Sequence, residues 1–123
     1  MSDAPQPVRL GQRAVGGGEL TRTQRLIWAS QRLHPDVAVA NMGKRSRIRG
    51  PLDPDRLVAA FDAVVRASDV LRMVVEAGSN DRARILERPP RATEVVDLRI
   101  ADLDAWSRER IAQPIDATEC VYD

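Results

Sequence analysis

Apolar residues recur at helical spacing over residues 21–33, in the stretch "TRTQRLIWASQRL". Thr21 and Gln24 have the spacing of a capping box, in which each side chain hydrogen-bonds to the other residue's backbone N–H. The apolar residues share one face, as in an amphipathic helix; they are Leu26, Ile27 and Leu33. The pattern therefore predicts a helix that begins after Thr21 and ends before Pro35, because proline disfavours helical geometry in the residue before it.

Two later stretches, residues 53–68 and 101–113, also have helical spacing. Asp53 is a good N-cap for the first of them, and Pro54 suits its first turn. We expect this helix to bury a stripe of Leu57, Phe61 and Val64, with Ala60 and Val65 beside it. The later helix is expected to turn three residues inward, namely Leu103, Trp106 and Ile111.

Strand patterns lie between and around these helices. In residues 71–88, apolar and polar positions alternate on both sides of the turn sequence Gly-Ser-Asn-Asp at 78–81, which predicts a hairpin. Three further short strands are predicted from extended-type sequence; they are residues 41–50, 93–98 and 119–123.

The order of these elements predicts an α/β fold, with helices packed on a mixed or antiparallel sheet. Residues 1–18 contain prolines, "GGG" and no periodicity, so they are interpreted as a flexible N-terminal lead-in. Residues 19–123 are expected to form one unit, and the strand at their end suggests a fold that is interrupted rather than completed.

Composition narrows the function classes. Charged residues make up 30% of the chain, but the net charge is only +1, which argues against a nucleic-acid binder because such a protein needs an excess of cations on one face. Cys120 is the only cysteine, so no internal disulfide can form and a reducing compartment is expected. No apolar run resembles a signal peptide or a membrane span. We therefore expect a cytoplasmic protein without membrane contact.

Four stretches, in order along residues 19–123, together resemble the condensation domains of nonribosomal peptide synthetases. "LTRTQRLIW" resembles the first core motif, "RIRGPLDPDRLVAAFDAVV" the strand and helix that follow it, "SDVLRMVVE" the second core motif, and "PID" a later Pro-Phe-Asp segment. The residues that carry the resemblance are Thr21, Gln24, Ile27 and Trp28 in the first motif, Leu71 and Arg72 in the second, and Pro114 and Asp116 in the last. The resemblance implies the N-terminal half of a chloramphenicol-acetyltransferase-like fold.

The chain also departs from that family. Ser68 stands where the second motif has a histidine, Asp69 replaces its glutamate, and Met73 replaces its threonine. The active-site motif of the family, His-His-x-x-x-Asp-Gly, is absent from the 123 residues. The resemblance therefore implies a piece that is inactive alone, whose partners are the remaining half of the domain and carrier proteins. The acyl groups would arrive on the phosphopantetheine arms of those carriers, and no cofactor would be bound directly.

Few residues of the chain itself suggest chemistry. His34, the single histidine, follows a helix and precedes a proline, so a surface-loop role is expected rather than that of a base. Cys120 has no neighbouring histidine in the sequence and is interpreted as a buried strand residue rather than a nucleophile. No His, Cys or Asp spacing suits a metal. Trp28 and Trp106 suit either an acyl channel or, preferably, ordinary core packing.

Three basic residues, Lys44, Arg45 and Arg47, lie in "GKRSRIRG". They have three interpretations: a phosphate-binding stripe, a solvated edge strand whose charges discourage aggregation, or a contact with a carrier protein or partner chain. Arg72 is expected to be buried beside an acidic partner outside the chain. A non-catalytic docking module is the alternative to the condensation half-domain, and self-association is expected of a severed half.

Overall fold

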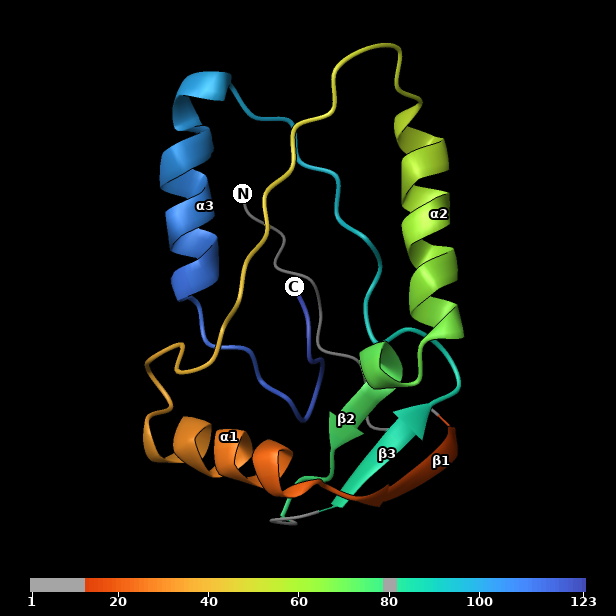
Figure 1. Cartoon of the computed structure of the whole chain (residues 1–123), viewed down its shortest axis with the longest axis vertical. Coiled ribbons are helices and arrows are strands. Elements are labelled where there is room, and N and C mark those ends of the chain that lie inside the picture. Colours follow the sequence, from red (N-terminus) through yellow and green to blue (C-terminus); the bar gives the residue numbers. More distant parts are fainter. Residues whose placement is uncertain (1–12, 79–81) are drawn as a thin grey trace.

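Three strands form one antiparallel sheet in the order β1–β3–β2, as the computed structural model of residues 13–78 and 82–123 shows (Figure 1). The strands are β1 (Ala14–Glu19), β2 (Met73–Val75) and β3 (Arg82–Leu86), and the helices are α1 (Arg22–Leu33), α2 (Pro54–Ala67) and α3 (Leu103–Ala112). Two short 3-10 turns, η1 (Val70–Arg72) and η2 (Ile100–Asp102), precede β2 and α3. The predicted α/β class is confirmed as three helices with an antiparallel three-stranded sheet.

The helix starts follow from the capping residues. The capping box of α1 is present, with the Thr21 N–H donating to Gln24 Oε1 at 2.9 Å and the Gln24 N–H donating to Thr21 Oγ1 at 3.2 Å. Asp53 caps α2 by accepting from the backbone of Asp55 and Arg56. These contacts satisfy N–H groups that have no partner inside a helix. The predicted positions of all three helices are confirmed.

Strand β1 corrects the prediction for residues 14–18. They are not a flexible lead-in but pair with β3, in a register that sets Gly17 opposite Arg84. A Cβ atom on Gly17 would lie 2.6 Å from the Ala83 carbonyl oxygen, so glycine permits a close approach that a larger residue would prevent. The triple glycine is thus part of a closely paired strand. Residues 1–12 lie outside the described part of the chain.

The predicted hairpin is confirmed, with Met73 opposite Ile85 across β2 and β3. Its first strand begins later than predicted, because Leu71 and Arg72 belong to the 3-10 turn η1, where the Arg72 N–H donates to the Asp69 carbonyl. Residues 79–81 of the predicted turn lie outside the described residues.

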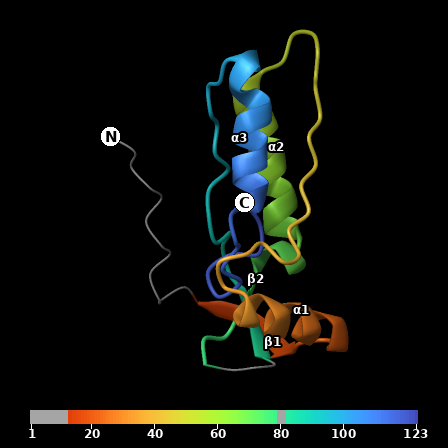
Figure 2. The same ribbon diagram turned by 90° about the vertical axis from the view of Figure 1, so that its left-hand side faces the viewer.

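The strands predicted at 41–50, 93–98 and 119–123 are wrong for the structure as described. Residues 41–49 and 93–98 run extended along opposite sides of α2 and α3 (Figure 2), and neither pairs with a strand of the described sheet. Residues 116–119 form a turn instead, in which the Glu119 and Cys120 N–H groups donate to the Asp116 carbonyl. An extended sequence becomes a strand only when a neighbouring backbone is available to pair with it.

The core is small and lies where the sheet meets α1. Leu20, Val75 and Ala83 form its buried cluster, against which Trp28, Met73 and Ala117 pack. Helices α2 and α3 rise away from the sheet in both views rather than covering it (Figures 1 and 2). The expectation of helices packed on the sheet therefore fails for these two.

The predicted buried stripe of α2 is largely exposed. Leu57, Phe61 and Val64 are 45%, 50% and 59% exposed, whereas Val65 beside them is 2% exposed. In α3, Leu103 and Trp106 are half-buried, but Ile111 is 43% exposed. The apolar face of α2 exists as predicted, but within the described structure little packs against it. The apolar residues predicted to share one face of α1 are exposed as well; they are Leu26, Ile27 and Leu33.

Candidate functional site

The residues of the first motif lie at the start of α1, beside the start of β2. Thr21 and Gln24 bond each other in the capping box, and the Gln24 amide nitrogen also approaches Met73 Sδ at 3.9 Å. Trp28, one turn further along α1, packs against the buried cluster. Thr21, Gln24 and Trp28 therefore fix the position of α1 relative to the sheet.

Arg72, from the second motif, clamps η1 to the end of β3. Its side chain is only 11% exposed; Nη1 donates to the Leu86 carbonyl at 2.5 Å and Nη2 to Asp69 Oδ1 at 2.7 Å. The prediction of an acidic partner outside the chain is therefore wrong, because Arg72 binds Asp69, three residues earlier in the same chain. Arg72 Nε is buried and has no hydrogen-bond partner among the described residues. Leu71, beside it, is half-buried.

The "PID" stretch reaches the same region from the other end of the chain. Asp116 Oδ1 accepts from the Thr118 N–H at 2.9 Å and from the Thr118 hydroxyl at 2.7 Å, which holds a tight turn. The turn presents the Ala117 carbonyl to the Val75 N–H at 2.8 Å. Pro114 lies just past α3, on the exposed approach to this turn. Three of the four stretches with family resemblance therefore lie around β2.

The motif residues around β2 hold the fold together and do not form a recognisable catalytic arrangement. Arg72 holds the Asp69 carboxylate in an ion pair, and the Asp116 carboxylate accepts from Thr118. Gln24 takes part in the capping box of α1. Residues of this kind hold neighbouring segments in a fixed arrangement, which is a precondition for a site elsewhere.

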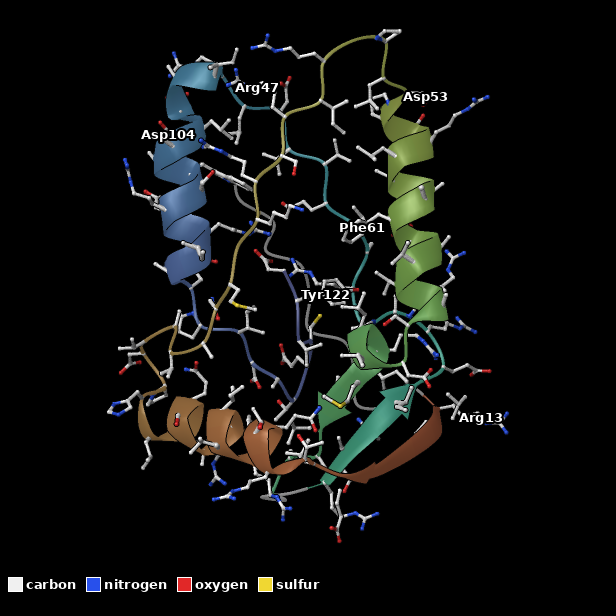
Figure 3. The ribbon with its side chains drawn as sticks, viewed as in Figure 1. Arg13, Arg47, Asp53, Phe61, Asp104 and Tyr122 are labelled. Carbon is white, nitrogen blue, oxygen red and sulfur yellow. The ribbon has the colours of Figure 1, made fainter. Side chains whose placement is uncertain are left out.

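The predicted basic contact residues lie far from this region, along the extended segment beside α3 (Figure 3). Arg45 Nη1 donates to Asp104 Oδ1 at 2.6 Å, and that hydrogen bond, with the charge of Arg45, lowers the pKa of Asp104. Lys44 and Arg47 are exposed and form no ion pair within the described ranges. The structure thus leaves Lys44 and Arg47 available to an external partner.

An ion-pair network near residue 123 was not predicted from the sequence. Arg110 bonds both Asp123 and Glu94, and Arg91 Nη1 donates to Asp123 Oδ1 at 2.5 Å. Burial alone would raise the pKa of Asp123, but hydrogen bonds and charge from Arg110, with a contribution from Arg91, lower it on balance. The same bonds raise the pKa of Arg110. These residues are scattered along the sequence, so no local motif could have revealed the network.

Trp106, His34 and Cys120 each make a contact that stabilises the fold. Trp106 lies under the Arg110 guanidinium at 5.5 Å, in cation–π geometry. His34 is exposed, and its backbone caps the end of α1. Burial raises the pKa of the Cys120 thiol, which donates to the Tyr122 carbonyl at 3.1 Å. A thiol of raised pKa is a poor nucleophile, which disfavours a nucleophilic role for Cys120.

The described residues include neither a candidate metal site nor a candidate membrane span. No group of His, Cys, Asp and Glu side chains there has the arrangement of a metal site. No described helix is long and apolar enough to cross a membrane. An open depression of about 480 Å³ lies between α2 and the segment after β3. Its charged lining residues are Asp62, Arg66, Glu87, Arg88 and Arg91.

Comparison with known proteins does not place the chain in a family. No protein family, curated protein or solved structure matches the sequence or the fold.

Proposed function

We propose that this chain is the N-terminal part of a condensation-type acyltransferase, which joins carrier-bound acyl or aminoacyl groups in nonribosomal peptide or hybrid polyketide biosynthesis. One observation supports the proposal most: the stretches that resemble the first and second motifs and the Pro-Phe-Asp segment lie far apart in the sequence and meet around β2. Motif residues that contact one another are expected of one functional unit and would be a coincidence among unrelated matches.

In such an enzyme an amine or hydroxyl attacks a thioester carbonyl. A C–N or C–O bond forms, the C–S bond breaks, and the phosphopantetheine thiol leaves. The step needs a base for the proton of the nucleophile and donors for the oxyanion. Neither His34 nor Cys120 can fill these roles in the positions described above. The catalytic histidines therefore come from a segment outside this sequence, and the chain alone is inactive.

The contribution of this part is to build one wall of the enzyme. Thr21 and Gln24 fix α1, Arg72 fixes the turn before β2, and Asp116 holds the turn that joins β2. Each acts by positioning backbone, so substitution is expected to disturb the fold before it disturbs any chemical step.

The basic residues Lys44, Arg45 and Arg47 are the proposed contact for an acidic carrier protein and the phosphate of its phosphopantetheine arm. This contact can be measured by fluorescence anisotropy, with a labelled carrier bearing its phosphopantetheine arm titrated with the chain. Reversing the charges of the two residues without an ion pair in the described structure, in K44E/R47E, should weaken binding roughly tenfold, as two surface charge contacts are lost.

The matched control is R22E/R25E, which makes the same change of charge on the exposed side of α1. It should leave carrier affinity unchanged. Failure of the unaltered chain to bind the carrier, or equal weakening in both double variants, would contradict the proposed contact.

A non-catalytic docking module is the second candidate. It is favoured by Ser68, which stands in place of the motif's histidine and ends α2 through its N–H bond to the Val65 carbonyl. Self-sufficiency distinguishes the two: a true module should be monodisperse and unfold cooperatively, whereas a half-domain should expose apolar surface and associate.

A further inference from the structure

The chain exposes more surface than a closed monomer of its mass. Its solvent-accessible surface is 9963 Å² at 13.6 kDa, against about 6,600 Å² expected for a compact monomer. The fifteen residues outside the described ranges do not account for the difference. Even at about 160 Å² each, the value for an unfolded chain, they leave an excess of about 1,000 Å². A standard interface needs about 800 Å² from each partner.

Two extended segments are unpaired and can extend a sheet. They are residues 44–49 and residues 93–98. No backbone–backbone hydrogen bond joins either of them to another part of the described structure. Ile48 and Val95 expose 59% and 69% of their surface. Unpaired extended backbone with exposed β-branched side chains is a template for strand addition.

The two segments are complementary in charge. The first carries four cations, Lys44, Arg45, Arg47 and Arg49, and the second carries two carboxylates, Glu94 and Asp97. A parallel pairing that sets Arg47 of one copy opposite Asp97 of the next forms one opposite-charge pair. The same register brings Lys44 opposite Glu94, which binds Arg110 within its own chain. Arg47 and Asp97 are exposed and have no ion-pair partner among the described residues. The opposite charges and the unpaired backbone of the two segments therefore suit them to pair with each other as strands.

They cannot pair within one molecule, because they lie on opposite sides of the α2–α3 pair. Figure 2 shows residues 41–49, in yellow, along one side and residues 93–98, in blue-green, along the other. The Arg45–Asp104 pair ties the first segment to α3, and the Thr93–Asp62 bond ties the second to α2.

We propose that copies of this chain associate head to tail, with segment 44–49 of one copy pairing with segment 93–98 of the next. The contact joins two different surfaces, so it is heterologous and each copy can bind a further copy at either end. The protein therefore forms a series of sizes that grows with concentration. This inference does not rest on the proposed enzyme function, since it uses only the two segments and their charges.

Sedimentation velocity over a range of concentrations tests the proposal with a charge swap. R47E and D97R should each weaken association roughly tenfold, because each turns an attraction into a repulsion. The double variant R47E/D97R restores opposite charges across the contact and should recover association. R25E, on the exposed face of α1, is the matched control and should behave like the unaltered chain.

Salt gives a second readout. Association should weaken between about 0.1 M and about 1 M NaCl, as the Debye length falls from about 10 Å to about 3 Å. Circular dichroism confirms that each variant is folded. The proposal is overturned by a chain that stays monomeric at every concentration, by single reversals without effect, or by a double variant that associates no better than the single ones. D97R should leave carrier binding intact, so failure here is distinguishable from failure of the carrier contact.

Discussion

Two neighbouring valines of α2 provide a matched test of which face of this helix is buried. Val65 is 2% exposed and Val64 is 59% exposed, although the sequence pattern assigns Val64 to the buried stripe. Replacing valine by alanine removes two methyl groups, about 1.6 kcal/mol of burial at about 0.8 kcal/mol each. At a site that cannot collapse, a cavity adds roughly 1 kcal/mol. Alanine returns about 0.5 kcal/mol as the better helix former.

V65A should therefore lower the free energy of unfolding by about 2 kcal/mol. V64A should change it by less than about 0.5 kcal/mol, because most of its surface is already exposed and the helix gain offsets the remainder. Urea unfolding followed by circular dichroism measures both, at a protein concentration low enough to keep the chain dissociated. Equal losses for V64A and V65A would refute the assigned orientation of α2.

Three further predictions concern polar groups. R72A should destabilise the chain by about 2 kcal/mol, since it removes a charged hydrogen bond and leaves the Leu86 carbonyl without its donor. Thermal unfolding measures this loss, and an unchanged midpoint would count against a stabilising role for the Arg72 hydrogen bonds. Because the pKa of Asp123 is lowered in the folded chain, its carboxylate stabilises the fold above the unfolded-state pKa. This stabilisation is lost as the pH falls through the folded-state pKa, below about pH 4. D123N should flatten that part of a curve of stability against pH, and an unaltered curve would contradict the prediction. Cys120 should react slowly with a thiol reagent until urea unfolds the chain, because burial raises its pKa and shields the sulfur; rapid labelling of the folded chain would disagree.

The helices could be predicted from the sequence because their signals are local. A capping box at Thr21 and an aspartate N-cap at Asp53 lie within one turn of the groups that they bond. Strand β1 could not, because its glycines have no side chains to show alternation. The need for glycine at position 17 arises from the approach of Ala83, which lies far away in the sequence.

The prediction of strands at residues 41–50 and 93–98 was wrong for a different reason. Residues 93–98 have strand-forming composition, but pairing requires a second backbone and an apolar surface to cover, and the described structure supplies neither. The exposure of Phe61 has the same origin, since a helical stripe predicts that a face is apolar and not that anything covers it.

Apart from the capping box of Thr21 and Gln24, the contacts of the candidate residues could not be predicted from the sequence. Thr21, Gln24 and Arg72 were identified by resemblance, and their other contacts could be known only from the structure. Asp69, the partner of Arg72, was placed outside the chain in error, although its spacing of three residues is a common one for ion pairs. The network of Arg110 with Glu94 and Asp123 could not be predicted, because it joins residues through the fold alone.

The most direct test of the proposed function is to read the coding sequence immediately after the codon for Asp123. The proposal predicts that the frame continues into His-His-x-x-x-Asp-Gly, which would supply the base that this part of the protein lacks. A continuing frame without that motif, or a stop codon with no neighbouring gene that encodes it, would contradict the assignment to a condensation enzyme.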